Sequence, residues 1–107
     1  MELNQYQVVL VNLDPTMGSE IRKTRPCVII SPVEMNRHLK TVVVAPMTTT
    51  IRTYPTRVKV RLNKKPGWIA IDQIRAIDRR RIIKSLGSLS PGEILKVKET
   101  IREAFVD

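Results

Sequence analysis

The chain has 107 residues, enough for one domain (residues 1–107) with a modest core, and 42% of them are hydrophobic but only 4% aromatic. Its formal net charge of +9 predicts a polyanionic partner, nucleic acid or an acidic protein, although some small basic proteins are merely soluble. One cysteine and one histidine exclude an internal disulfide and a Cys/His zinc cluster, so we expect no metal and no cofactor. No apolar run approaches the roughly 20 residues of a membrane span, and no signal peptide begins the chain, so we expect a cytoplasmic protein.

The first half of the chain predicts strands rich in β-branched residues. An apolar run at residues 6–13 predicts a buried strand that ends at the turn signal Asp14-Pro15. The following polar loop, residues 14–24, is longer than most connections, as functional loops often are. Two further strands and an intervening helical turn are predicted at residues 25–31, 41–47 and 32–38.

The second half predicts more strands and then one helix. Residues 57–62 alternate polar and apolar side chains, which is typical of a strand with one face in solvent. A hairpin loop at 63–67 leads to a strand at 68–71, and another strand, broken at Gly87, is predicted at 81–89. Ser90-Pro91-Gly92-Glu93 is a capping box, and apolar residues at helical spacing follow it up to Phe105. The expected fold is therefore mostly β: a small barrel with a C-terminal helix against it.

Four motifs resemble the MazF/PemK toxin family. They are Asp14-Pro15-Thr16 with Gly18-Ser19-Glu20, then Arg25-Pro26 before a strand, Pro46 with Thr48 after the next, and Asp72-Gln73 with Arg75 and Ile77-Asp78. The resemblance implies an SH3-like barrel of the MazF/CcdB type that forms a homodimer. It also implies the toxin of a type II toxin-antitoxin system, an mRNA interferase that is held inactive by a cognate acidic antitoxin.

Arg25 and Thr48 are the predicted catalytic pair. A guanidinium offers a planar fork of donors that matches phosphate oxygens, and Pro26 restricts the backbone of Arg25 to an extended form. Taken alone, an arginine at a strand start is more often simply solvated, and a threonine at a strand end more often bonds local backbone. The resemblance assigns catalysis to both residues.

Glu20 is the candidate proton acceptor. Metal-independent RNA cleavage uses the substrate's 2′-hydroxyl as nucleophile, which needs a base and a group that stabilises the phosphorane, and it leaves a 2′,3′-cyclic phosphate and a 5′-hydroxyl. An ion pair with Arg22, Lys23 or Arg25 is the alternative role of Glu20. Ser19 stands where some family members have histidine, so a histidine acid or base is not expected at this turn.

Further residues are candidates for binding single-stranded RNA, whose bases can splay out to be read. They are Ser19, Arg22, Lys23, Thr49, Asp72, Gln73 and Arg75. For Asp72 the alternative is an ion pair with Arg75 that holds the turn. Ala70 occupies a position where some relatives carry an arginine with a catalytic role, so that variant of the chemistry is not expected. Cys27, within an apolar run, is expected to be inert core.

Two functions remain open at this point. One is a sequence-specific endoribonuclease. The other is a non-enzymatic toxin or binding module of the CcdB type that acts on a protein target such as gyrase. The pairing of Arg25 with Thr48 favours the nuclease, because a protein-directed poison needs no group that clamps phosphate.

Overall fold

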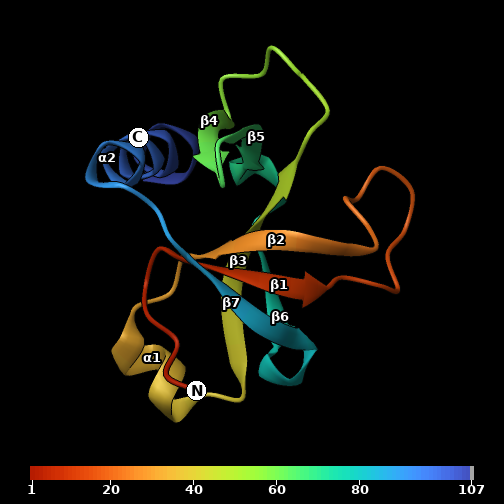
Figure 1. The fold of residues 1–107 in the computed structure, drawn as a ribbon, viewed down its shortest axis with the longest axis vertical. Coiled ribbons are helices and arrows are strands. Elements are labelled where there is room, and N and C mark those ends of the chain that lie inside the picture. Colours follow the sequence, from red (N-terminus) through yellow and green to blue (C-terminus); the bar gives the residue numbers. More distant parts are fainter. Residues whose placement is uncertain (107) are drawn as a thin grey trace.

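The computed structural model describes residues 1–106, and Asp107, the last residue of the expected domain, lies outside this part. Strands dominate the fold, with two α-helices (Figure 1). The strands are β1 (Gln7–Asn12), β2 (Thr24–Ile29), β3 (Thr41–Thr48), β4 (Arg57–Leu62), β5 (Lys65–Ala70), β6 (Arg75–Asp78) and β7 (Ile82–Ser88). The helices are α1 (Val33–His38) and α2 (Pro91–Ile101), with short turns η1 (Ile71–Gln73), η2 (Arg79–Arg81) and η3 (Arg102–Val106).

The strands form one curled antiparallel sheet in the order β4-β5-β3-β2-β1-β7, and β6 pairs with β3. β3 joins the two parts of the sheet. Its middle pairs with β2 up to Cys27 opposite Pro46, whereas its last residues, Met47 and Thr48, pair with β5. The predicted mostly β, barrel-like fold with a C-terminal helix is confirmed.

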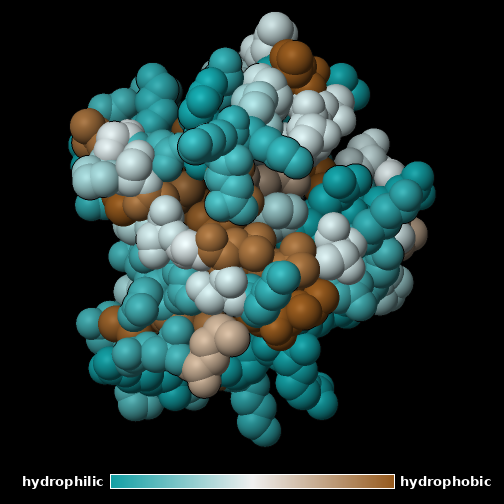
Figure 2. Space-filling view, in the orientation of Figure 1, coloured by the Kyte–Doolittle hydropathy of each residue, from teal (hydrophilic) through white to brown (hydrophobic). Residues whose placement is uncertain are grey.

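The central strands β1, β2 and β3 are covered on both faces, which explains their nearly continuous apolar runs, whereas β4 has one face in solvent and β7 is mostly exposed. Alternate residues of these strands enter two hydrophobic clusters. One cluster, which includes Val97 of α2, contains Val8, Val28, Ala45, Met47 and Ile69. The other contains Val9, Val11, Cys27, Ile29 and Val44. Hydrophobic residues also reach the surface in a band across the face in Figure 2, over the crossing of β1, β2 and β7.

Helix α2 begins as its sequence predicts. The Ser90 hydroxyl accepts a hydrogen bond from the Glu93 amide, and the Glu93 carboxylate accepts one from the Ser90 amide. Val97 is fully buried, and α2 lies beside β4 (Figure 1). Phe105, expected on the apolar face, is instead 62% exposed, because the last turn, η3, carries it away from the core. No helix within residues 1–106 is long and apolar enough to cross a membrane.

Three details differ from the sequence-based expectation. The β4–β5 hairpin turn is only Asn63-Lys64, both with positive φ (51° and 67°), so β5 begins at Lys65 and not at Trp68. Gly87 does not break β7: at φ 126° it lies in an irregularity of the β1–β7 register, and the strand continues to Ser88. β6 was not predicted, since Arg75–Asp78 is short and mixed in polarity, and its pairing with β3 is a tertiary effect.

Candidate active site

Arg25 and Thr48 meet where β2 and β3 separate. The two strands are in register at Cys27 opposite Pro46, and two more residues along this register place Arg25 opposite Thr48. At that point β3 turns to pair with β5 instead, with Thr48 opposite Trp68. The divergence of the two strands opens space on both sides of the two side chains. The sequence motifs located both residues, but only the register brings them together.

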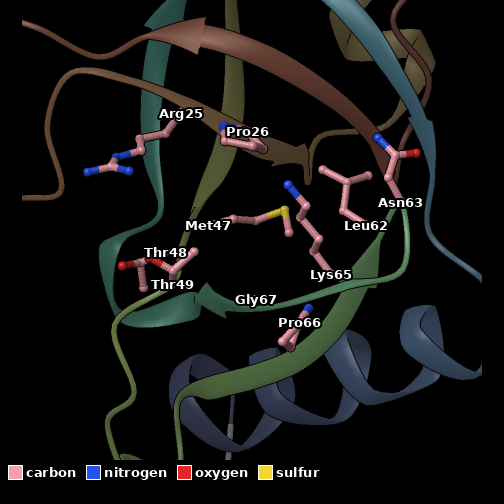
Figure 3. A pocket seen from close by; sticks show the side chains of 10 residues that line it. All are labelled: Arg25, Pro26, Met47, Thr48, Thr49, Leu62, Asn63, Lys65, Pro66 and Gly67. Atoms are coloured by element: carbon pink, nitrogen blue, oxygen red, sulfur yellow. The ribbon is translucent and has the colours of Figure 1, made fainter.

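Two cavities share Arg25 and Thr48 as lining residues. The apolar cavity, about 260 Å³, is also lined by Pro26, Met47, Leu62, Asn63, Lys65 and Gly67 (Figure 3). The polar cavity, about 460 Å³, is also lined by Glu20, Arg22, Arg52, Arg57, Asp72 and Gln73. A group held between Arg25 and Thr48 would therefore have an apolar surface on one side and a charged surface on the other.

The side chains of Arg25 and Thr48 both have hydrogen-bond donors that are free to bind a ligand. Arg25 Nε donates to the Arg22 carbonyl at 3.2 Å, and within residues 1–106 its two terminal nitrogens have no hydrogen-bond partner. Thr48 Oγ1 accepts a hydrogen bond from the Thr50 amide at 3.1 Å, which leaves its hydroxyl proton available. The local backbone bond considered above for Thr48 is thus present, and it still leaves the hydroxyl able to donate.

Glu20 lines the polar cavity from the long loop between β1 and β2. One carboxylate oxygen, Oε1, accepts a hydrogen bond from the Met17 amide at 2.6 Å. In the described part of the chain Glu20 forms no ion pair, so the expected alternative with Arg22, Lys23 or Arg25 is wrong. The second oxygen remains free to accept a proton.

The β1–β2 loop is held at its base and in its middle. At the base, Leu13 N donates to the Lys23 carbonyl at 2.9 Å, and Lys23 N donates to Asp14 Oδ1 at 3.1 Å. In the middle, Gln73 Oε1 accepts from Ile21 N at 2.7 Å, and Gln73 Nε2 donates to the Ser19 carbonyl at 3.4 Å. Gln73 therefore fastens the loop that carries Glu20, and its side-chain amide is occupied by backbone.

Asp72 pairs with Arg57 and not with Arg75. Arg57 Nε and Nη2 donate to the two oxygens of Asp72 at 2.9 and 3.2 Å, and the Thr56 hydroxyl donates to Oδ1 at 2.9 Å. Burial by itself would raise the pKa of Asp72, but the hydrogen bonds from Arg57 and Thr56 outweigh it and lower the pKa. Arg75 Nη1 donates to the Leu13 carbonyl at 3.3 Å, so the expected Asp72–Arg75 pair is wrong.

Arg57, which lies beside Tyr54 in this site, was missed by sequence reasoning. The Arg57 side chain is only 7% exposed, and its guanidinium lies 5.2 Å from the centre of the Tyr54 ring. Both line the polar cavity. No local pattern marks Arg57, since its partner is 15 residues away on the far side of a hairpin.

Cys27 is fully buried, and this burial raises its pKa to about 12, as expected of an inert core thiol. Among residues 1–106, no group of three or more His, Cys, Asp or Glu side chains is placed to hold a metal ion.

The family model for PemK-like, MazF-like toxins of type II toxin-antitoxin systems matches residues 4–105. The chain belongs to this family. It is 34% identical to the endoribonuclease MazF of Staphylococcus epidermidis, over 92% of this chain and 88% of that protein. It is 32% identical to the endoribonuclease toxin MazF of Escherichia coli (strain K12), over 88% and 86% of the two chains.

Solved MazF structures share the fold. MazF (Form-I) of Deinococcus radiodurans superposes with a TM-score of 0.86 at 23% identity, covering 96% of each chain. A mycobacterial endoribonuclease in complex with its cognate antitoxin gives a TM-score of 0.81 at 26% identity, covering 95% of this chain and 93% of that one.

Within this MazF-family fold, most of the predicted site residues lie around the two cavities. Those that line at least one of them are Arg25, Thr48, Glu20, Ser19, Arg22, Thr49, Asp72 and Gln73. Arg75 lines a neighbouring hollow beneath the same loop. Lys23 lines neither cavity: it is exposed at the base of the loop with φ 70°. Ala70, at the position where the resemblance implies an arginine in some relatives, is fully buried.

Proposed function

We propose that this MazF-family chain is the toxin of a type II toxin-antitoxin system and a sequence-specific endoribonuclease that cleaves single-stranded mRNA without a metal ion. The observation that carries the proposal is the meeting of Arg25 and Thr48, with free donors, between two cavities. Relatives named endoribonuclease at 32–34% identity support the same activity. They do not favour the alternative of a CcdB-type poison directed at a protein target such as gyrase.

In the proposed mechanism, the substrate's 2′-hydroxyl oxygen attacks the adjacent phosphorus, and the bond to the 5′-oxygen of the next nucleotide breaks. A 2′,3′-cyclic phosphate and a 5′-hydroxyl result. Arg25 and Thr48 donate hydrogen bonds to the non-bridging oxygens, where negative charge grows in the phosphorane. The free oxygen of Glu20 takes the proton of the 2′-hydroxyl, and water supplies a proton to the leaving oxygen.

The proposed RNA-binding residues fall into two groups. Arg22 has an exposed side chain at the polar cavity, where it is suited to phosphate, and Ser19 and Thr49 offer exposed hydroxyls. Lys23 and Arg75 add positive charge at a greater distance. We propose an indirect role for Asp72 and Gln73, because their polar atoms already hold Arg57 and the β1–β2 loop.

We propose three further properties on the same basis. The chain acts as a homodimer, which the exposed Ile83 on the edge strand β7 supports, because an edge strand with exposed apolar residues favours self-association. A cognate acidic antitoxin blocks the cationic site, as charge complementarity favours. The cytoplasm, where mRNA is translated, is the site of action.

The test is cleavage of a defined RNA pool by the purified protein in EDTA, with sequencing of the new 5′ ends. We expect cuts within a short common sequence that leave 5′-hydroxyl ends. Arg25→Ala should slow cleavage by about 100-fold or more, because it removes a donor to the phosphorane. Arg37→Ala removes an exposed arginine on α1 and is the matched control, with unchanged cleavage expected. Wild-type cleavage rates in Arg25→Ala would contradict the proposal.

A further inference from the structure

We propose that the apolar cavity binds the nucleobase on one side of the cleaved phosphodiester and thereby selects the RNA sequence that is cut. The inference rests on the proposed nuclease function and adds a specificity site to it. Its starting point is that Arg25 and Thr48 line both cavities, so a phosphodiester held between them sends one neighbouring nucleotide toward each. The two cavities differ in character, so each offers its nucleotide a different environment.

The polar cavity is suited to the charged phosphate backbone of the RNA, and the apolar cavity is suited to a nucleobase. Arg22, Arg52 and Arg57 line the polar cavity, where they can neutralise phosphates. Pro26, Met47 and Leu62 line the apolar cavity and offer hydrocarbon and sulfur surface to the flat face of a heterocycle. A base that is unstacked from single-stranded RNA can thus be buried in the apolar cavity, on one side of the cleaved bond.

Polar groups at the rim can read the edge of such a base. In Figure 3, Met47 and Lys65 extend into the middle of the apolar cavity, with Arg25 and Thr48 on one side and Asn63 on the other. Asn63 offers both a donor and an acceptor, and Lys65 offers donors. Asn63 belongs to the two-residue turn between β4 and β5, and Lys65 begins β5, so hairpin geometry fixes the backbone from which both side chains extend.

Gly67 indicates that space in this cavity matters. Its φ is outside the left-handed region, so the backbone at this position does not require glycine. An added Cβ would lie 3.5 Å from Met47 Cε and 3.8 Å from the Thr48 carbonyl oxygen, both ordinary contacts. An alanine methyl group here would fit without a clash and would take up room beside the catalytic pair. Gly67→Ala can thus fill part of the cavity without disturbing the backbone.

The experiment compares cut sites of the wild type, Gly67→Ala and Gly67→Val on one RNA pool. We expect the preferred base at one position next to the cut to change, and cleavage of the wild-type sequence to slow by on the order of tenfold or more. An RNA with an abasic residue at that position should be cut equally by all three proteins, because no base remains to be excluded. Gly92→Ala, at an open position in α2, is the matched control and should keep the wild-type profile.

Leu62→Ala provides a second variant that enlarges the same cavity, so the test does not depend on Gly67→Val folding. Melting curves verify that each variant is folded. If the wild type cuts RNA but Gly67→Ala and Leu62→Ala keep its base preference, the cavity does not bind a base, and an apolar side chain of a protein partner becomes the occupant. That result would leave the nuclease function intact. A wild type that cuts no RNA would overturn both proposals.

Discussion

Thr48 combines a structural contact with a free donor at the last position of β3. The Thr50 amide donates to its Oγ1 at 3.1 Å, so one lone pair of the hydroxyl is occupied and the side chain has a preferred orientation. The hydroxyl proton can then point toward a phosphate held by Arg25. Local bonding and catalysis are therefore compatible in this residue, although the sequence presents them as alternatives.

Replacing the hydroxyl of Thr48 by a methyl group keeps the shape of the side chain but removes its hydrogen-bond donor, so it tests the hydroxyl alone. We expect Thr48→Val to lower kcat by about 100-fold, as loss of one oxyanion donor does elsewhere, while Thr48→Ser keeps most of the rate. Single-turnover cleavage of a short RNA is the measurement. Thr41→Val, an exposed change at the other end of β3, is the control. A Thr48→Val enzyme as fast as Thr48→Ser would exclude a role for the hydroxyl.

At the scale of the elements, the β1–β2 loop depends on a side chain from η1. Gln73 accepts from Ile21 N at 2.7 Å and donates to the Ser19 carbonyl at 3.4 Å, which places Glu20 beside the polar cavity. We therefore propose that Gln73 acts through the loop and not on the substrate, as a positioning residue. The loop also carries Arg22 and Lys23, two trypsin sites that report on its mobility.

Gln73→Ala should release this loop. We expect faster trypsin cleavage after Arg22 or Lys23 and a fall in kcat/KM of about tenfold or more, because small misplacements of a reacting group are costly. Mass spectrometry of the limited digest and initial-rate kinetics are the measurements. Gln5→Ala, which removes a glutamine that donates to the Ile30 carbonyl, is the control. Unchanged proteolysis together with lower activity would instead favour direct contact between Gln73 and RNA.

Glu93 links the start of α2 to β4. Its carboxylate accepts hydrogen bonds from Ser90 N at 2.9 Å and from Arg61 N at 2.8 Å. Burial would raise its pKa, but the bonds from Ser90 and Arg61 outweigh burial and lower the pKa. The carboxylate therefore stabilises the fold above its unfolded pKa of about 4.3, and this stabilisation is lost as the pH falls through the lower folded value.

Glu93→Ala should therefore lower the free energy of unfolding by about 1–2 kcal/mol at pH 7. The difference from the wild type should shrink at pH 3, since protonation weakens the same bonds in the wild type. Urea unfolding at the two pH values is the measurement, and Glu99→Ala, an exposed change in the same helix, is the control. A difference that does not depend on pH would show that the charge of Glu93 is not involved.

At the scale of the whole molecule, the net charge of +9 is the property that acts over the longest range. Several cations gather at the polar cavity, among them Arg22, Arg25 and Arg52. Each phosphate they neutralise releases counterions from single-stranded RNA, which makes affinity depend on salt. A protein target would show a weaker dependence.

The logarithm of RNA affinity should fall linearly with the logarithm of salt concentration, with a slope of about −2 or steeper if three phosphates are held. Fluorescence anisotropy with an oligonucleotide that has 2′-deoxyribose at the cut position measures binding without cleavage. Arg52→Ala should reduce the slope by about 0.7. Arg37→Ala, on the surface of α1, should leave the slope unchanged, and a flat response of the wild type would favour a protein partner.

Sequence patterns predicted the elements that local chemistry controls. Apolar runs gave β1, β2 and β3, alternation gave β4, and the capping box gave α2. β6 was not predicted, because its sequence is short and mixed in polarity and it forms a strand only by pairing with β3. The hairpin turn was placed too broadly, since Pro66 and Gly67 look like turn residues, whereas Asn63 and Lys64 take the positive φ angles.

For the site, the sequence alone determined which side chains could act: the guanidinium of Arg25, the hydroxyl of Thr48 and the carboxylate of Glu20. Only the tertiary structure decided which of them meet and which groups support them. The register of β2 with β3 aligns Arg25 with Thr48, and β3 then leaves β2 for β5, which opens a cavity on each side. Asp72 pairs with Arg57, and Gln73 hydrogen-bonds to the β1–β2 loop, although these partners are far apart in the sequence. Such pairings depend on how strands align across the sheet, so the sequence around each residue does not predict them.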